Sequence, residues 1–298
     1  MRRYRVVYVD AFTEVPLEGN PCAVFPDAQG LSEQEMQAIA RETNLSETAF
    51  VFPSERADFR VRYFTPRGEI PFAGHPTIAT VFLLAEEGRI ALQGPTTRLE
   101  VEFRIGVLPV EVEAQGGVPK RVVMTQRRPT FRAIFSREEV APCLGLEVSS
   151  LRDDCPCQVV DTGVPFLLVP VRDLAVLERV QVDRPALQVL CRQAGVDAAF
   201  AFCLGGFRPE ADTHARLLDP WGSHEDPFTG SASGAMAAFV VRYGLKTGPR
   251  LVAEQGHFVG RPGYGVLEVL GAREDLEAVR LAGPAVRVLE GEFLLPDR

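Results

Sequence analysis

The chain has 298 residues, of which 46% are hydrophobic and 24% are charged, which is the balance of a soluble globular protein of about two domains. The formal net charge of −8 argues against a nucleic acid or an anionic membrane as partner, because both require a basic face. No run approaches the roughly 18–20 apolar residues of a membrane span, and the first residues alternate in polarity, so the sequence predicts a cytoplasmic protein without a signal peptide.

The first half of the chain predicts several strands and two helices. Ser32 and Glu35 form a capping box that opens a helix to about Thr43, and a second helix is expected over Gly74–Glu87, ended by Gly88. The strands are expected at Arg5–Ala11, Cys22–Phe25, Thr48–Pro53 and Phe59–Thr65, followed by a hairpin of Arg98–Phe103 and Gly106–Glu113.

A linker is predicted at Ala114–Pro119, and the second half then repeats this pattern. Helices are expected after the capping box of Ser136 and Glu139, from Asp183 to about Gly195, and over Gly230–Tyr243. The strands are expected at Arg121–Gln126, Phe166–Pro170, Ala198–Leu204 and Thr213–Leu218, with strand and turn over Arg250–Phe293. This order is not the regular strand–helix alternation of a parallel sheet, and favours a mainly antiparallel sheet curled around one central helix in each half.

A short segment occurs twice, once in each half. Glu69–His75 returns as Glu225–Ser231 with the same Glu, Pro, Phe and Gly at the same spacing, and each copy runs into a predicted helix. The first-turn N–H groups would be unsatisfied at the positive end of the helix dipole, where carboxylates and phosphates bind readily. The alternative is that both copies are ordinary helix entries, with Ser231 as a cap. The repetition predicts a duplicated chain.

Three further residues are candidates for chemistry. Glu47 is flanked by apolar side chains, and partial desolvation raises the pKa of a carboxyl group and suits it to proton transfer, although a solvated loop glutamate is the alternative. Asp226 would orient His75 or simply sit favourably near a helix start. Arg261, in a glycine-punctuated turn, would clamp a carboxylate or make a surface ion pair, and the sequence leaves both open.

The sequence predicts no metal and no cofactor. The four histidines show no paired metal spacing, and no glycine-rich nucleotide loop is visible. Of the six cysteines, only Cys155 and Cys157 are close in sequence, with one residue between them. All six are expected to be reduced and structural, most of them buried. The role of the Cys155–Cys157 pair stays open.

Several segments, taken together and in this order, resemble the PhzF family of phenazine-biosynthesis proteins, which has a diaminopimelate-epimerase-like fold. The resemblance covers nearly the whole chain. The segments are Asp10–Phe12, Gly19–Pro21, Met36–Glu42, Ser46–Thr48, Phe64–Pro66, Phe72–Thr77, Asp226–Ala232, Gln255–Gly256 and Gly260–Pro262.

The resemblance implies an α+β fold of two pseudo-symmetric lobes, each a curved antiparallel sheet or barrel around a central helix. The first lobe would comprise residues 1–115, completed by 284–298, the second would comprise 120–283, and the active site would lie in the cleft between them. A small-molecule carboxylate substrate, a homodimer and the absence of a cofactor are further implications.

The resemblance also assigns roles to individual residues. Glu47 matches the general acid/base of the family, and His75 and Asp226 match its polar partners. The helix-start positions that hold the substrate are Gly74, Gly230 and Ser231.

Related racemases use a cysteine at each helix start, where this chain has Ala73 and Thr229, so two-thiol racemisation is not expected. The resemblance therefore predicts a cofactor-independent isomerase that moves a proton on a small unsaturated carboxylic acid. The alternatives are an epimerase or racemase that uses Glu47 and His75 as opposed bases, and a binding protein that has lost catalysis.

Overall fold

The computed structural model describes residues 1–222 and 225–297. One of the four histidines, His224, and the last residue of the segment 284–298 therefore lie outside the described residues. The chain divides into two compact units. Unit 1 comprises Met1–Met124 and Ala282–Arg298, and unit 2 comprises Thr125–Leu281.

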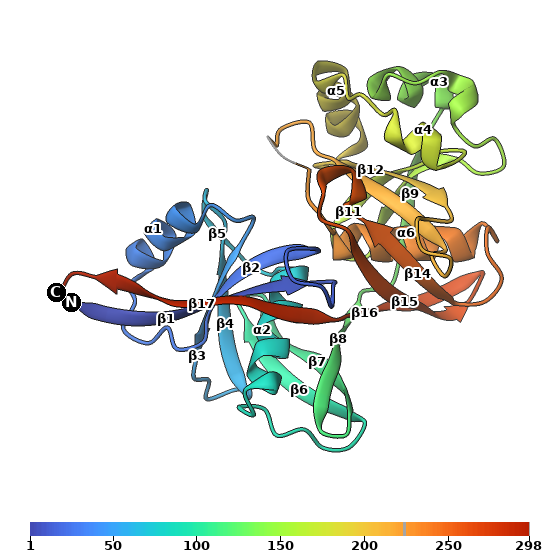
Figure 1. Ribbon diagram of the computed structural model, residues 1–298. Helices are drawn as coiled ribbons and strands as arrows, with labels where there is room; N and C mark the ends of the chain where they lie inside the picture. Colours follow the sequence, from blue (N-terminus) through green and yellow to red (C-terminus); the bar gives the residue numbers. More distant parts are fainter. Residues whose placement is uncertain (223–224, 298) are drawn as a thin grey trace. The chain divides into compact units, whose positions relative to one another are not determined.

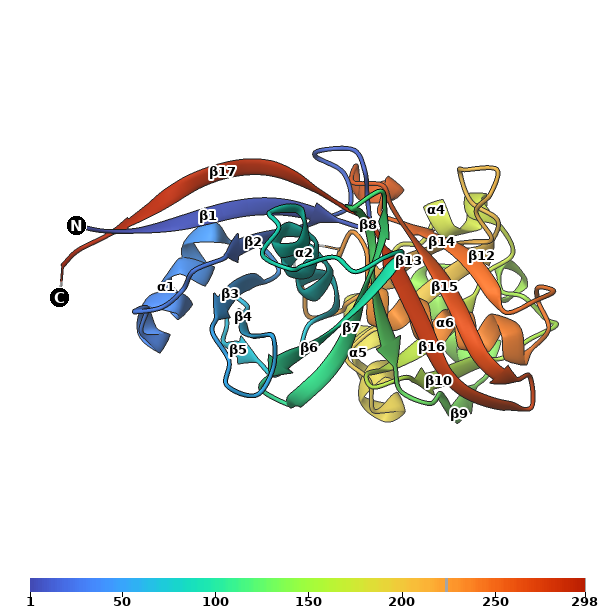
Figure 2. The same ribbon diagram turned by 90° about the horizontal axis from the view of Figure 1, so that it is seen from below.

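Unit 1 is a mixed sheet with two helices, α1 (Glu33–Thr43) and α2 (Gly74–Glu86). Its strands are β1 (Arg2–Ala11), β2 (Asn20–Phe25), β3 (Thr48–Phe52), β4 (Phe59–Phe64), β5 (Glu69–Ile70), β6 (Thr96–Phe103), β7 (Gly106–Gln115), β8 (Val118–Gln126) and β17 (Ala285–Leu295). They pair in the order β17–β1–β2–β3–β4–β6–β7–β8, and β5 pairs with β4. Figures 1 and 2 show β1 and β17 side by side as a long ribbon that carries both chain termini.

Unit 2 is a second mixed sheet whose longest helix is α6 (Gly230–Arg242). Its other helices are α3 (Arg137–Val140), α4 (Leu174–Glu178) and α5 (Arg184–Ala194), with short 3₁₀ turns η1 (Ala141–Leu144), η2 (Val148–Ser150) and η3 (His257–Val259). Its strands are β9 (Thr130–Phe135), β10 (Cys157–Asp161), β11 (Pro165–Pro170), β12 (Ala199–Leu204), β13 (Thr213–Leu218), β14 (Arg250–Gln255), β15 (Gly263–Ala272) and β16 (Asp275–Gly283). Strands β9 to β15 pair in chain order.

The two units share one strand topology. In unit 1, β2 runs parallel to β3 across α1, β3 is antiparallel to β4, and β4 runs parallel to β6 across α2. In unit 2, β11 runs parallel to β12 across α4 and α5, β12 is antiparallel to β13, and β13 runs parallel to β14 across α6. A further antiparallel pair follows in each unit, β6–β7 and β14–β15. The duplication predicted from the repeated segment therefore extends to the strand pairing.

One expectation needs correction. The predicted linker at Ala114–Pro119 is wrong, because Ala114 pairs with Pro119 and Gln115 with Val118 in the β7–β8 hairpin. Gly116 and Gly117, both at positive φ, form its turn, as hairpin turns require. Antiparallel pairing predominates as predicted, but the strands on either side of each crossover helix are parallel, since a helix carries the chain back to the starting end of the sheet.

The central helix of each unit is enclosed by its own sheet. Residues 75–85 of α2 are all buried, and α2 packs on β1, β2, β3, β7 and β17. In α6, residues 232–240 are all buried. A helix that is apolar on every side is stable only when it is surrounded, so both helices are core elements rather than surface ones. Their first turns are consequently held in fixed positions.

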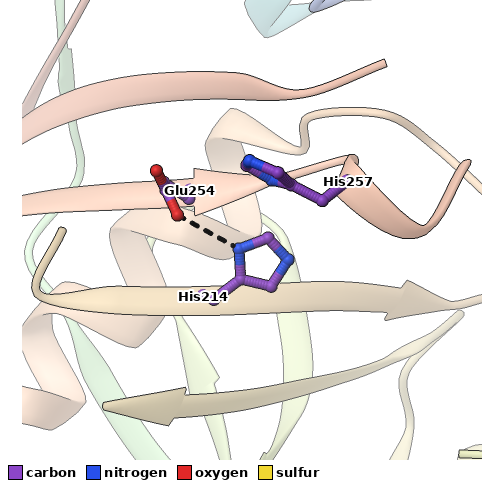
Figure 3. Close-up of side chains that lie close together, drawn as sticks. All are labelled: His214, Glu254 and His257. Carbon is purple, nitrogen blue, oxygen red and sulfur yellow. Dashed lines mark ion pairs between the residues drawn. The ribbon is translucent and has the colours of Figure 1, made fainter. Parts of the chain in front are cut away.

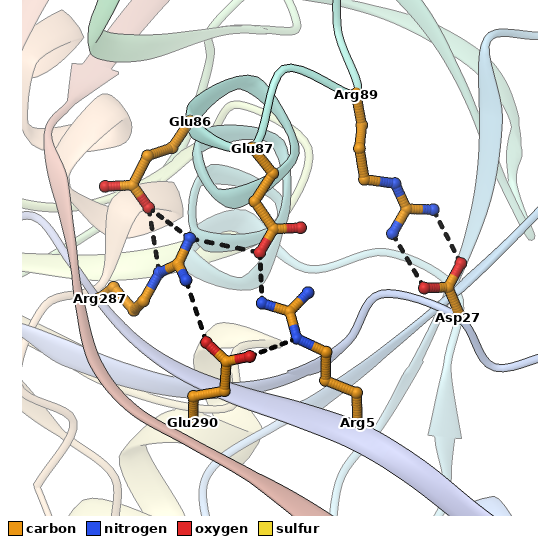
Figure 4. Close-up of polar contacts among 7 residues, drawn as sticks. All are labelled: Arg5, Asp27, Glu86, Glu87, Arg89, Arg287 and Glu290. Carbon is orange, nitrogen blue, oxygen red and sulfur yellow. Dashed lines mark hydrogen bonds and ion pairs between the residues drawn. The ribbon is translucent and has the colours of Figure 1, made fainter.

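A network of charges holds the far end of α2 (Figure 4). Arg287 lies 2.9 Å from Glu86 and 3.2 Å from Glu87, and Arg5 contacts Glu87 at 2.5 Å and Glu290 at 2.7 Å. The arginines lie beside the negative end of the helix dipole, where cations are stabilising. Such a network orders the surface more effectively than isolated ion pairs do.

The glutamate of the repeated segment has the same structural role in both units. Glu69 makes a two-pronged ion pair with Arg62 of β4, at 2.7 Å for both contacts. Glu225 makes the equivalent pair with Arg216 of β13, with a shortest contact of 2.8 Å. Bidentate pairs of this kind fix geometry as well as charge. The shared glutamate is therefore part of the framework that leads into each central helix.

The six cysteines are free thiols and buried, as predicted. Burial raises the pKa of Cys155 and of Cys157 to about 12, so both remain protonated at neutral pH. Within the described part of the chain, no helix has both the length and the apolar composition needed to cross a membrane.

Candidate active site

Glu47 lies at the end of the loop that joins α1 to β3. Helix α1 ends at Asn44, whose left-handed backbone (φ 50°) turns the chain, and the hydroxyl groups of Thr43 and Thr48 lie 2.9 Å apart across the loop. The next residue after Glu47 enters β3, which is buried. The side chain of Glu47 is only 20% exposed. The prediction of a partly desolvated carboxyl group is therefore confirmed, and the solvated alternative is wrong.

His75, in the first turn of α2, meets this carboxyl group. Its Nε2 lies 3.4 Å from Glu47 Oε2, and its side chain is 8% exposed. Burial lowers the pKa of His75 to about 3, an effect that a hydrogen bond from the ring to the carbonyl of Pro21 only partly offsets. The imidazole is therefore neutral near pH 7. Because Nε2 faces Glu47, the ring nitrogen that donates to Pro21 is Nδ1, which leaves a lone pair on Nε2.

The start of α2 is open at the backbone. The N-cap residue is Ala73, and no side chain of the described residues caps the helix. A Cβ placed on Gly74 would meet nothing within 4 Å, so space lies next to this residue. The turn is held from the inside, because the hydroxyl of Thr77 donates to the Ala73 carbonyl at 2.6 Å and lies 2.7 Å from the Tyr63 hydroxyl. Backbone N–H groups at an uncapped helix start are the kind of group that can bind an anion.

The start of α6 in unit 2 is built with more polar support. The N-cap residue is Thr229, whose hydroxyl donates to Asp226 Oδ2 at 2.5 Å. Gln255 accepts from the Thr229 N–H at 2.9 Å and donates to the Asp226 carbonyl at 2.7 Å. Among the described residues, none caps α6 with its side chain, so the alternative in which Ser231 is the cap is wrong. Asp226 is therefore locked beside the first turn that carries Gly230 and Ser231.

The structure thus groups the predicted site residues in two sets. Glu47, His75 and Gly74 lie together in unit 1, and Asp226, Gly230 and Ser231 lie together in unit 2. Sequence reasoning missed two supporting residues, Gln126 and Thr162. Gln126 donates to the Gly230 carbonyl at 2.8 Å and accepts from the Thr162 hydroxyl at 2.7 Å. No local pattern marks either residue, because their partners are 36 to 104 positions away in the sequence.

Both roles suggested for the Arg261 side chain, a carboxylate clamp and a surface ion pair, stay predictions. Its N–H donates to the carbonyl of Gly256 at 3.0 Å and closes the turn that follows β14. Its backbone is thus structural, whereas the function of its guanidinium group stays a prediction.

The neutral state of His75 predicts a specific pH dependence of stability. Its pKa is about 3 in the folded protein and 6.5 ordinarily, so the unfolded chain binds a proton between these values and the folded chain does not. The free energy of unfolding is expected to fall by about 1 kcal/mol per pH unit as the pH drops from 6 to 4. Urea unfolding of the wild type and of His75→Asn, whose amide nitrogen can still donate to Pro21, measures this. Parallel pH curves for the two proteins would contradict the assignment.

Comparison with known proteins identifies the family. Residues 9–291 match the sequence model of the PhzC-PhzF family, described as phenazine biosynthesis-like protein. The chain is 33% identical over 99% of both chains to an uncharacterised isomerase of Clostridium acetobutylicum. It is 34% identical to the trans-2,3-dihydro-3-hydroxyanthranilate isomerase of Pseudomonas aeruginosa, over 98% of this chain and 100% of the relative.

A solved structure agrees with these matches. The PhzF-family phenazine biosynthesis protein of Bacillus anthracis superimposes with a TM-score of 0.90 at 33% identity, over 99% of this chain and 100% of the other. The predicted α+β class and diaminopimelate-epimerase-like fold are confirmed. Since the family model and the relatives span almost the whole sequence, this chain belongs to the PhzF family and is an isomerase of that family.

Proposed function

We propose that this chain is a cofactor-independent isomerase that moves a proton between carbon atoms of a small unsaturated carboxylic acid. The observation that carries the proposal is the contact of Glu47 with a buried, neutral His75 beside the uncapped start of α2. A carboxyl group that is mostly shielded from water and held next to a neutral imidazole can both release and accept a proton near neutral pH.

In this reaction Glu47 is the general acid and base. Its carboxylate takes a proton from a carbon next to the unsaturated system, the double bond shifts, and the carboxyl group returns the proton to a second carbon, so that no co-reactant is needed. The Nε2 lone pair of His75 accepts a hydrogen bond from the protonated carboxyl group and holds it in place between the two transfers. The N–H groups of Gly74 and His75 stabilise the substrate carboxylate and the charge that develops on it.

The contact distance counts against the alternative in which Glu47 and His75 act as opposed bases. Opposed bases approach one carbon from opposite faces, and a carbon atom does not fit between two groups whose nearest atoms lie 3.4 Å apart. For Asp226, Gly230 and Ser231, the roles of a polar partner and of substrate-holding positions stay predictions of the family resemblance. The homodimer and the cytoplasmic location also stay predictions.

Isotope exchange tests this function. The wild-type chain is incubated in D₂O with trans-2,3-dihydro-3-hydroxyanthranilate, the substrate that the name of one relative gives, and with a panel of small unsaturated carboxylic acids. We expect at least one acid to gain deuterium at a new C–H position as its double bond moves, followed by NMR. Inversion at a carbon without a double-bond shift would establish the epimerase. Tight binding in calorimetry without exchange in any acid would establish the binding protein.

A further inference from the structure

A histidine from one strand comes together in unit 2 with a glutamate from the neighbouring strand and a histidine from the turn that follows it (Figure 3). His214 lies on β13, Glu254 lies on the neighbouring β14, and His257 lies in η3 just after β14. One nitrogen or oxygen of each side chain lies within 4.8 Å of the others. The spacing of the histidines in the sequence did not predict a metal centre. Positions 214 and 254 come to lie side by side only because β13 pairs with β14.

His214 is the unusual member of this group. Its side chain is completely buried, yet neither ring nitrogen has a hydrogen-bond partner among the described residues. The nearest polar atom given for it is Glu254 Oε2, 3.5 Å from Nδ1. His257 Nδ1 also lacks a hydrogen-bond partner in the described part of the chain. Buried polar groups are normally satisfied, so these nitrogens indicate a missing ligand.

Two backbone N–H groups hold the carboxyl group of Glu254 next to His214. Its two oxygens accept from the N–H groups of Phe207 at 2.8 Å and Arg208 at 3.1 Å. Gly206 makes the close approach feasible, because a Cβ there would lie 2.3 Å from Glu254 Oε2.

Aromatic rings set the orientation of both imidazoles. Phe207 stacks on His257 with ring centres 4.3 Å apart, and its edge also packs against His214 at 5.2 Å. Phe258 packs edge-on against His214 at 5.3 Å. Rings packed in this way limit the rotation of both imidazoles.

We propose that His214, Glu254 and His257 bind a divalent transition-metal ion of the Zn²⁺ type. Two imidazoles and one carboxylate form a donor set that Zn²⁺ takes with a fourth position left for water or another ligand. Donor atoms 3.5 Å apart fit an ion about 2 Å from each of them. The widest separation, up to 4.8 Å, closes by an inward movement of His257, which is only partly buried.

Arg208 opposes the ion. Its Nε lies 3.6 Å from Glu254 Oε1, and its guanidinium group covers the ring of Tyr264 at 4.1 Å. Removing this positive charge is therefore expected to tighten metal binding, whereas a purely structural cluster would show no such gain. The alternative is a buried cluster of these three side chains that binds no metal.

Titration of the full chain with Co²⁺ and Zn²⁺ after chelation and dialysis tests the site. We expect one ion per chain by calorimetry, and visible ligand-field bands for Co²⁺ without a thiolate charge-transfer band. Saturating Zn²⁺ at about 100 times Kd should raise Tm by roughly 5–10 °C. Absence of stoichiometric binding would overturn the proposal in favour of a metal-free cluster, and a thiolate band would place the ion at the cysteines.

Variants locate the ion. Glu254→Gln, whose single amide oxygen can still accept from one of the Phe207 and Arg208 N–H groups, and His257→Gln are each expected to weaken binding at least about tenfold. Glu277→Gln, at an exposed carboxyl group of the same unit, is the matched control and should bind like the wild type. Arg208→Gln should bind several-fold more tightly, so the proposal stays falsifiable even if one ligand variant fails to fold. Unchanged affinity in Glu254→Gln, His257→Gln and Arg208→Gln would overturn it.

Discussion

Replacing Glu47 with glutamine is expected to lower kcat/KM by about 10²- to 10⁴-fold, the usual contribution of a positioned general acid or base. Glutamine keeps the size and hydrogen-bonding shape of the side chain but cannot take a proton from carbon. The overall fold is expected to be retained, because the side chain is partly exposed at a loop end. Deuterium incorporation from D₂O into the substrate should disappear in parallel with turnover.

A matched substitution separates this effect from a change of surface charge. Glu42, on the exposed side of α1, lies five positions before Glu47 in the same part of unit 1. Glu42→Gln is expected to keep wild-type turnover and exchange. Wild-type exchange in Glu47→Gln would remove the proton-transfer role from this residue and leave the family assignment unaffected.

Gly256→Ala is expected to reduce the free energy of unfolding by about 3 kcal/mol or more. The residue has a φ of +92°, and a Cβ there would lie 2.1 Å from the carbonyl oxygen of Arg261 and 2.7 Å from that of Pro227. Both neighbours are backbone atoms, so the strain cannot be relieved by turning a side chain. Because Gln255 holds Thr229 and Asp226, a shifted turn should also disturb the start of α6. Chemical denaturation measures the loss.

Gly260 provides the control at the other end of the same 3₁₀ turn. It also has positive φ, at 71°, but a Cβ there would meet nothing within 4 Å. Gly260→Ala therefore costs only the left-handed backbone conformation, about 1 kcal/mol. Equal destabilisation by the two substitutions would show that steric overlap at Gly256 is not the main effect.

The helix caps and helix starts, which depend on residues a few positions apart, were predicted correctly from the sequence. Both capping boxes, at Ser32 and at Ser136, have the predicted reciprocal hydrogen bonds. The starts of α2 and α6 fall at Gly74 and Gly230 as expected. These features depend on hydrogen bonds to residues three or four positions away, so the local sequence contains all the groups that form them. The motif order was likewise enough to predict the family.

The linker and the strand directions were decided by strand pairing. Residues 114–119 have the glycine content of a linker, and only the pairing of β7 with β8 makes them a hairpin. Parallel pairing of β4 with β6 depends on α2 returning the chain along the sheet, which no strand pattern alone can show. Strands β9 and β10 were not predicted from the sequence.

The sequence by itself determined the family, the fold class, the helix starts and the candidate residues at each of them. The tertiary structure alone decided which of these residues meet. Glu47 and His75 are 28 positions apart, and their contact exists because β3, which begins directly after Glu47 and lies between β2 and β4, packs against α2. The same reason applies to His214, Glu254 and His257, which only the pairing of β13 with β14 unites. The sequence gives the chemical type of each side chain at its own position. Which side chains lie close together depends on how segments far apart in the sequence fold around a buried helix.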